Sequence, residues 1–372
     1  MFFRRTPALP GMVRDHTRGK CAPGDLLSKS SVETTTITGW SRYVFRFPQD
    51  YSTIGSRTLN LNPQTTAFVF PGQGSQTVGM GKDLAEGHPI AKETLDEADS
   101  ILGFSLSPLM WNGPDTELND TVNTQPALYI HSVAAWRMLK HLYPEFRPAI
   151  VAGHSLGELS ALTASGALSF THGLKLVRTR GELMKRAGEL NPGGMAAILG
   201  VDIPTIDKVC AEASTADEIV QVANDNCPGQ VVISGHKPAL ERAMAGAKAA
   251  GAKRAMALQV SIAAHSPLMD SIQKEWNAAV DACTMEKPSI AVIGNVHARP
   301  MLTADDLRAD IKGQMQSRVR WTESVQMMLE NGIQTYVEAG SGDVLLGLIK
   351  RIDSSSTRIA LGNPQDFAAL ES

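Results

Sequence analysis

The residues whose types and spacing most clearly suggest catalysis are Gly153-His154-Ser155-Leu156-Gly157, which match the pattern Gly-x-Ser-x-Gly. In this pattern the serine lies in a sharp strand-to-helix turn, where small flanking residues let the backbones approach and the hydroxyl is exposed. The N–H of the next residue, Leu156, then faces the reacting centre and can stabilise an oxyanion. A tight turn with an incidental serine matches the same pattern, so the surrounding elements must decide between the two interpretations.

A general base must accompany such a serine, because its hydroxyl is a weak nucleophile at neutral pH. The chain contains nine histidines. His265 follows a strand-like segment, 254–260, and precedes a helix that we expect to begin near Ser266, so it can face the serine across a cleft. His154 adjoins the serine, but we expect its side chain to point away and to support the turn.

The elements around Ser155 fit the context that the pattern requires. The apolar run 149–152 predicts a buried strand, and the Ala- and Leu-rich stretch that ends at Leu168 predicts a helix. Strand, glycine turn and helix together form an α/β unit. Further strands are predicted at 67–70, 291–294 and 335–338, and further helices at 126–142, 171–187, 321–330 and 344–351. Pro126 suits the first turn of its helix.

An inserted segment interrupts this pattern. Between Met195 and Leu258 we predict strand, helix, strand, strand, helix and strand, which is the order of a ferredoxin-like unit. The polar run 224–229, Asn-Asp-Asn-Cys-Pro-Gly, is predicted as the turn between its two middle strands. We therefore expect an α/β core over 63–190 and 263–360, an inserted ferredoxin-like subdomain over 191–262, and a C-terminal tail over 361–372.

The first 62 residues differ in composition from the rest of the chain. They contain nine Lys and Arg against four Asp and Glu, with no sustained apolar period, and we expect a disordered extension. Three origins remain open: an organelle transit peptide, a start of translation nearer Pro63, or a basic tail. We expect a cytoplasmic protein, with the mitochondrial matrix or a plastid as the alternative if the extension is a transit peptide.

Composition excludes several functional classes. The net charge of −3 shows none of the positive excess typical of nucleic-acid binding. No apolar run approaches the roughly 20 residues of a membrane span. The four cysteines are far apart, with neither metal-ligand nor disulfide spacing, which favours a reducing compartment.

The sequence as a whole resembles the malonyl-CoA:acyl carrier protein transacylase family of fatty acid synthesis. The resemblance rests on several motifs in the same order, from about Thr66 to about Arg358. These motifs are Phe70-Pro71-Gly72-Gln73-Gly74-Ser75-Gln76, Gly153-His154-Ser155-Leu156-Gly157-Glu158, Val177-Arg178-Thr179-Arg180-Gly181, Val260-Ser261-Ile262-Ala263-Ala264-His265-Ser266 and Val319-Arg320-Trp321. The family implies an α/β-hydrolase-like core with a parallel sheet and a ferredoxin-like insertion.

The resemblance implies roles for the residues that match. Ser155 is the nucleophile and His265 the general base, forming a Ser-His dyad. The backbone carbonyl of Gln314 orients the histidine, although residues 314–318 depart from the family's usual sequence. The implied reaction moves malonyl from malonyl-CoA to the phosphopantetheine thiol of acyl carrier protein through a malonyl-serine ester. No metal or bound cofactor is implied, and we expect a monomer with no membrane partner.

Substrate recognition is implied in the same way. The backbone N–H of Gln73 joins that of Leu156 in an oxyanion hole. Arg180 binds the free carboxylate of malonyl, whereas without the resemblance it would be interpreted as a solvated helix arginine. Asn224 and Asn226 are weaker candidates for lining the cleft. The alternatives are a serine esterase or thioesterase on the same turn, an acyltransferase of polyketide type, and a catalytically silent acyl-carrier scaffold.

Overall fold

The computed structural model describes residues 31–37, 40–46 and 59–370. In the first two ranges, β1 (Ser31–Ile37) pairs antiparallel with β2 (Trp40–Arg46). Part of the segment that we expected to be disordered therefore forms paired strands. The transit-peptide hypothesis concerned residues 1–62, and most of these, 1–30, 38–39 and 47–58, lie outside the described residues.

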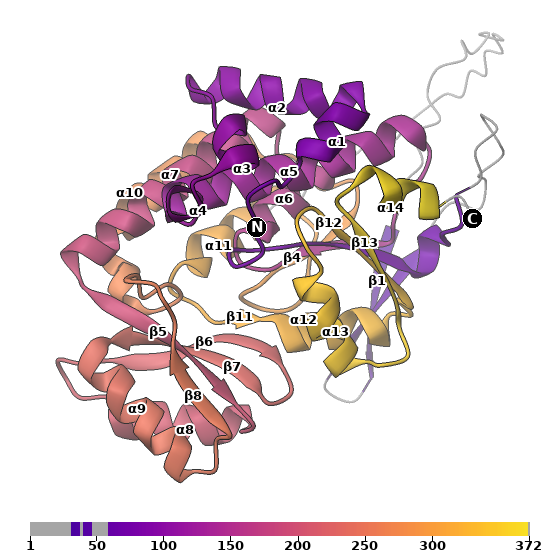
Figure 1. Ribbon diagram of the computed structural model, residues 1–372. Coiled ribbons are helices and arrows are strands. Elements are labelled where there is room, and N and C mark those ends of the chain that lie inside the picture. The colour runs from indigo at the N-terminus through magenta and orange to yellow at the C-terminus, as the bar shows by residue number, and fades with distance from the viewer. Residues whose placement is uncertain (1–30, 38–39, 47–58, 371–372) are drawn as a thin grey trace, which may run out of the picture.

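A six-stranded, mostly parallel sheet forms the centre of the larger unit (Figure 1). Its strands are β3 (Thr66–Phe70), β4 (Ile150–Gly153), β9 (Ala291–Ile293), β10 (Pro300–Met301), β12 (Thr335–Ala339) and β13 (Thr357–Leu361). Their order is β10-β9-β4-β3-β12-β13, and the pairs are parallel except for β10 with β9. The chain therefore has the mixed α/β fold with a parallel sheet that the sequence predicts.

Helices bury both faces of this sheet, as a parallel sheet requires. In β3, Phe68 and Phe70 belong to one hydrophobic core and Ala67 and Val69 to the other, because successive side chains of a strand point to opposite faces. The first core is closed by α1 (Lys82–Gly87), α2 (Pro89–Leu102), α3 (Ser107–Asn112), α4 (Asp115–Leu118), α5 (Thr121–Leu142), α6 (Gly157–Ala164), α7 (Phe170–Leu190), α10 (Asp270–Ala282), α11 (Ala304–Gln314) and α14 (Pro364–Ala369). The second is closed by α12 (Trp321–Glu330) and α13 (Val344–Ile352).

Two sequence predictions about the helices were wrong. Helix α5 begins at Thr121, where the Asp120 side chain accepts from the N–H of Val122, so Pro126 lies inside the helix and not in its first turn. The segment expected as a C-terminal tail contains α14, whose Phe367 is buried in the larger core. In the described residues, no helix combines the length and apolarity that crossing a bilayer would need.

A smaller sheet lies at one side of the molecule, at the lower left of Figure 1. It contains β5 (Gly193–Leu199), β6 (Val220–Cys227), β7 (Gln230–His236), β8 (Arg254–Ala257) and β11 (Val319–Arg320), in the order β11-β6-β7-β5-β8. Helices α8 (Ile203–Ala213) and α9 (Lys237–Ala249) pack on it around a separate core. Strand β11 was not predicted: it comes from the larger unit and pairs parallel with β6.

Strand β6 extends further than its sequence predicts. Asn224, Asp225 and Asn226 were expected in a turn, but they continue the strand, and only Pro228 and Gly229 turn the chain into β7. The asparagine and aspartate side chains are buried, and two of them have polar partners outside the strand: the Thr322 hydroxyl donates to Asp225, and Asn226 accepts from His154. Tertiary hydrogen bonds therefore override the turn preference of these residues.

Candidate active site

The turn around Ser155 has the geometry that its sequence pattern requires. β4 ends at Gly153 and α6 begins at Gly157, and Ser155 between them has φ of 52°. A Cβ on Gly153 would lie 1.9 Å from the Gly157 carbonyl carbon, and one on Gly157 would lie 2.0 Å from the Phe70 oxygen. Only glycine fits at these two positions, and the surrounding packing maintains the strained serine conformation.

Asn295, which follows β9, is hydrogen-bonded to both sides of this turn. Its Oδ1 accepts from the Ser155 N–H at 2.7 Å, and its Nδ2 donates to the Gly153 carbonyl at 2.7 Å. The Asn295 N–H donates in turn to Asp310 Oδ2 at 3.0 Å. Asn295 was not among the residues predicted from sequence. Its position just after the strand predicted at 291–294 was the available signal, since the carboxyl ends of parallel strands share one edge.

Ser155 and His265 are in hydrogen-bonding contact. Ser155 Oγ lies 2.8 Å from His265 Nε2, and His265 Nδ1 lies 2.8 Å from the Gln314 carbonyl oxygen. Because a carbonyl can only accept, Nδ1 carries the proton and Nε2 is free to accept from the serine. Burial, together with the charge of Arg180, lowers the pKa of His265 to about 3, so the ring is a neutral base at neutral pH.

Arg180 is buried beside the serine, with only 2% of its surface exposed. Its Nη2 donates to Ser155 Oγ at 3.1 Å and to Gln314 Oε1 at 2.9 Å, and its Nη1 donates to Gln125 Oε1 at 2.9 Å. Its Nε is buried without an acceptor among the described residues. Burial lowers the pKa of Arg180 to about 10, which leaves the guanidinium charged at neutral pH. A buried cation bonded only to uncharged oxygens can still accept an anion.

Gln314 connects this cation to an acid behind the serine. The Gln314 side-chain amide donates to the Ser155 carbonyl at 3.0 Å and to Glu158 Oε2 at 2.5 Å. Glu158 is completely buried. Burial, and next the charge of Asp310, raise the pKa of Glu158 well above its usual value. The sequence predicted only the backbone carbonyl of Gln314, and neither carboxyl group.

The N-terminal turn of α5 reaches the same site. The Thr121 hydroxyl donates to Gln73 Oε1 at 3.0 Å, and Gln125 Nε2 donates to Thr121 Oγ1 at 3.0 Å. These bonds form a continuous chain from Gln73 through Thr121 and Gln125 to Arg180. Sequence analysis missed Thr121 and Gln125 because it placed the start of this helix at Pro126.

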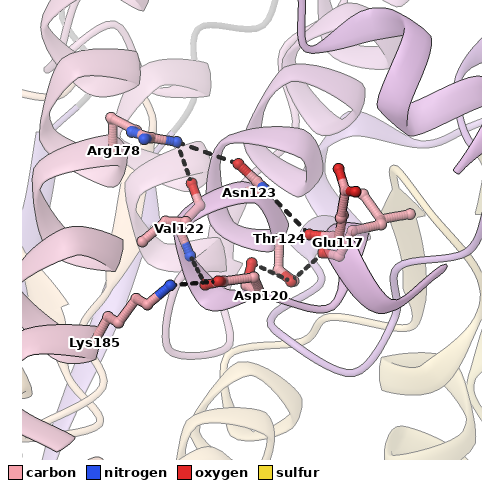
Figure 2. Close-up of polar contacts among 8 residues, drawn as sticks. Glu117, Asp120, Val122, Asn123, Thr124, Arg178 and Lys185 are labelled. Carbon is pink, nitrogen blue, oxygen red and sulfur yellow. Dashed lines mark hydrogen bonds and ion pairs between the residues drawn. The ribbon is translucent and has the colours of Figure 1, made fainter. Parts of the chain in front are cut away.

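Figure 2 shows how α7 holds that turn. Pro126 has no N–H, so the Val122 carbonyl one turn earlier lacks its helical partner. Arg178 Nη1 supplies the missing hydrogen bond, donating to the Val122 carbonyl at 2.9 Å. Lys185 Nζ pairs with Asp120 Oδ2 at 2.6 Å. Helix α7, which carries Arg180, is thereby attached at two points to the turn that carries Thr121.

Two backbone donors lie in the loops that adjoin the serine. Among the described hydrogen bonds, neither the Gln73 N–H nor the Leu156 N–H has an acceptor. The loop after β3 contacts the serine turn directly, since a Cβ on Gly72 would lie 2.4 Å from the His154 carbonyl oxygen. The two unpaired N–H groups therefore belong to adjoining loops, as an oxyanion hole requires.

His154 points away from the serine, as expected. Its Nε2–H donates to Asn226 Oδ1 at 2.8 Å, and its ring packs edge-on to Trp321 at 5.7 Å. Asn226 thus supports the turn through His154. The buried Asn224 pairs in the sheet with Val319.

A cavity of about 720 Å³ lies between the smaller sheet and the helices α12 and α13. None of Ser155, His265 and Arg180 lines it. Its charged and polar lining comes from Asp202, Asp225, Lys253, Arg254, Thr322 and Arg351. Both acids are engaged, because Asp202 caps α8 and Asp225 accepts from Thr322. By count, three basic residues (Lys253, Arg254 and Arg351) face these two acids, a formal net charge of 3 − 2 = +1 on the cavity wall.

Comparisons with known proteins identify the family of the chain. The model of the acyl transferase domain family matches residues 67–358. The malonyl CoA-acyl carrier protein transacylase of Haemophilus influenzae is 44% identical over 305 residues, covering 82% of this chain and 97% of that protein. The Bacillus subtilis protein of the same name is 43% identical over 299 residues, covering 80% and 94%.

Solved structures agree as well. The malonyl CoA-acyl carrier protein transacylase of Coxiella burnetii superposes with a TM-score of 0.81 at 38% identity, covering 84% of this chain and 98% of that one. A malonyl-transacylase solved in complex with its type II polyketide acyl-carrier protein superposes with a TM-score of 0.79 at 40% identity, covering 82% and 98%. This chain therefore belongs to the acyl transferase domain family, as a member of the malonyl CoA-acyl carrier protein transacylases.

Proposed function

We propose that this protein transfers malonyl from malonyl-CoA to the phosphopantetheine thiol of an acyl carrier protein, through a malonyl ester of Ser155. The observation that carries the proposal is the position of Arg180, whose Nη2 lies 3.1 Å from Ser155 Oγ while no carboxylate of the described residues is hydrogen-bonded to it. A buried guanidinium beside the nucleophile favours an acyl group that brings its own carboxylate.

In the first half-reaction His265 acts as the general base. Its Nε2 accepts the proton of Ser155 as Oγ attacks the thioester carbonyl carbon. The tetrahedral oxyanion accepts hydrogen bonds from the N–H groups of Gln73 and Leu156, and one such donor is typically worth about 3–4 kcal/mol. The carbon–sulfur bond then breaks, and the imidazolium returns the proton to the departing thiolate of coenzyme A.

The second half-reaction reverses these roles. The pantetheine thiol of the carrier protein gives its proton to His265 Nε2, and its sulfur attacks the ester carbonyl. Collapse of the second oxyanion releases Ser155, which recovers the proton. Because both acyl donor and product are thioesters, the free energy change is close to zero, and the site must exclude water as a competing acceptor more than it must drive the transfer.

A serine esterase or thioesterase is the alternative. Hydrolases with this turn usually orient their histidine with an Asp or Glu side chain. Here the histidine is oriented by the Gln314 carbonyl at 2.8 Å. This favours the transferase, as does the uncompensated Arg180. We also infer that the larger unit is an α/β-hydrolase-like core and that the smaller sheet, with β8-β5-β7-β6 in ferredoxin-like order, is a ferredoxin-like insertion.

The basic cavity beside the smaller sheet suits the phosphates that coenzyme A and phosphopantetheine share. Lys253 and Arg254 line it, and neither side chain has a hydrogen-bond or ion-pair partner among the described contacts. Changing both residues to Ala should raise KM for malonyl-CoA and acetyl-CoA alike, because both substrates carry the same coenzyme A phosphates. A change in the malonyl-to-acetyl ratio would contradict this assignment.

Intact-protein mass spectrometry tests the proposed function directly. Wild type mixed with malonyl-CoA should gain one malonyl mass and lose it when an acyl carrier protein with free thiol is added. Ser155→Ala should not gain the mass, and His265→Ala should slow both its gain and its transfer. An adduct that forms at the wild-type rate on Ser155→Ala, or that decays in buffer as fast as with carrier protein, would refute the proposal.

A further inference from the structure

Gln221 is a polar residue of β6 that the steps above do not use. Its neighbours Val220 and Val222 belong to the core that α8 and α9 cover, so Gln221 points to the opposite face of the smaller sheet, because side chains alternate along a strand. On that face its Nε2 donates to two backbone carbonyls, that of His265 at 2.7 Å and that of Gln316 at 3.0 Å. A side-chain amide has two N–H groups, so this one residue can satisfy both carbonyls.

These two carbonyls belong to the two chain segments that determine where the imidazole ring lies. The first is the carbonyl of His265 itself. The second lies two residues after Gln314, whose own carbonyl accepts from His265 Nδ1 at 2.8 Å. Among the described hydrogen bonds, no other donor reaches either the His265 or the Gln316 carbonyl. Gln221 therefore joins the two segments through their backbones, independently of the ring.

The backbone of His265 is in a conformation that needs such support. Its φ is 58°, in the left-handed region, which a residue other than glycine keeps only where its surroundings enforce it. The smaller sheet also packs against the residues just before it, since a Cβ on Gly193 would lie 2.6 Å from the Cβ of Ala263. The segment after Gln316 continues into β11, which pairs with β6. The smaller sheet thus contacts both segments.

We propose that Gln221 is a positioning residue for the general base. Its side-chain amide holds the His265 and Gln316 carbonyls together, which keeps His265 Nδ1 on the Gln314 carbonyl and Nε2 on Ser155 Oγ. The inference rests on the proposed role of His265 as the base. It makes the smaller sheet a support for proton transfer in both half-reactions.

Gln221→Met tests this role, because methionine keeps the length of the side chain and removes both donors. The kcat/KM should fall by about tenfold or more for malonyl-CoA and acetyl-CoA alike, since a correctly placed general base is worth about 10²–10⁴-fold in rate. The malonyl-to-acetyl ratio should not change, because Gln221 has no bond to Arg180 or to its partners among the described contacts.

Ser234→Ala is the matched control. Ser234 lies opposite Gln221 on β7, so both side chains are on the same face of the smaller sheet. It is 0% exposed, and its Oγ has no hydrogen-bond partner among the described residues. The substitution removes a polar group beside Gln221 without changing the two carbonyl bonds, so kcat/KM should equal that of wild type.

NMR of isotope-labelled histidine rings provides a readout that a loss of stability alone would not move. In wild type at neutral pH, the Nδ1–H of His265 should give a hydrogen-bonded, slowly exchanging proton signal, assigned by its absence in His265→Ala. In Gln221→Met this signal should shift and its proton should exchange faster with water. The ring signals of His131 and His154 should stay in place, because these buried rings are bonded to Gly362 and Asn226.

A lower kcat/KM for both acyl-CoAs, together with a moved His265 signal, would support the proposal. Wild-type kcat/KM in Gln221→Met, a loss for only one of the two acyl-CoAs, or a loss with an unmoved His265 signal would overturn it. If His265→Ala transfers malonyl at the wild-type rate, the proposed function fails instead. The His265 signal in Gln221→Met then still decides whether the amide positions the ring.

Discussion

Arg180→Ala should convert a malonyl-selective site into one that no longer discriminates against acetyl. In wild type the guanidinium is 2% exposed and its nearest partners are uncharged oxygens of Gln125, Gln314 and Ser155. The malonyl carboxylate is therefore the first anion that it can pair with. Acetyl brings no such group, so the two substrates differ only in the interaction that the substitution removes.

The size of the effect follows from burial. Removing one partner of a buried, hydrogen-bonded charge pair costs about 2–5 kcal/mol. At about 1.4 kcal/mol per factor of ten, the malonyl-to-acetyl ratio of kcat/KM should fall by roughly 30-fold or more. Arg180 also bonds to Ser155 Oγ and to the Gln314 side chain, so both substrates should lose some rate in common. The ratio cancels that common loss and isolates the carboxylate.

The assay measures kcat/KM for malonyl-CoA and acetyl-CoA with the same carrier protein as acceptor. Arg180→Lys should give an intermediate ratio, because ammonium keeps the charge but lacks the planar fork of donors. Arg186→Ala is the matched control on the same helix, since Arg186 is exposed and pairs with Glu275. It should leave the ratio unchanged. If Arg180→Ala keeps the wild-type ratio within about twofold, a threshold far below the expected loss, the guanidinium does not bind malonyl and the reasoning is refuted.

Two further predictions concern stability. The pKa of His265 is lowered to about 3 in the folded protein, so between about pH 6.5 and 3 only the unfolded chain binds that proton. The free energy of unfolding should therefore fall as pH decreases through this window, by up to about 1.4 kcal/mol per pH unit. Urea unfolding of wild type and His265→Asn from pH 7 to 4 measures this contribution, which the variant should lack. Parallel plots of the free energy of unfolding against pH for the two proteins would contradict the prediction. Arg178→Met should cost about 1–3 kcal/mol, because it leaves the Val122 carbonyl unpaired, whereas Lys185→Met should cost under about 1 kcal/mol as an exposed pair. Equal losses in the same unfolding assay would argue against the role of Arg178 beside Pro126.

The turn around Ser155 could be predicted from sequence because its cause is local. Gly153 and Gly157 are required by contacts within a few residues or with the adjoining strand, so the pattern carries its own geometry. The strand before it and the helix after it supplied the context. His265, Arg180 and the Gln314 carbonyl lie 110, 25 and 159 positions from the serine. The position of His265 suggested that it could face the serine, but only the family resemblance assigned a role to each of the three.

The parts that could not be predicted depend on long-range partners. Asn224 to Asn226 have turn-forming side chains, yet buried hydrogen bonds to His154 and Thr322 keep them in a strand. Pro126 suggested a helix start, but the carbonyl it leaves unpaired is satisfied by an arginine from another helix. Asp120, the true cap, was the local signal for the earlier start.

The double attachment of α7 limits how this enzyme can change its substrate. Arg178 and Lys185 are seven residues apart, two helical turns, so they lie on one face of the helix and fix its rotation as well as its position. Arg180 lies between these two residues in the sequence. Sliding or turning this helix to widen the acyl pocket would break the Arg178 bond to the Val122 carbonyl and the exposed Lys185–Asp120 pair, so replacing side chains is the less costly way to accommodate a larger or uncharged acyl group. Engineering for other acyl groups should accordingly begin at position 180 and at its partners on α5, with Arg178 and Lys185 left in place.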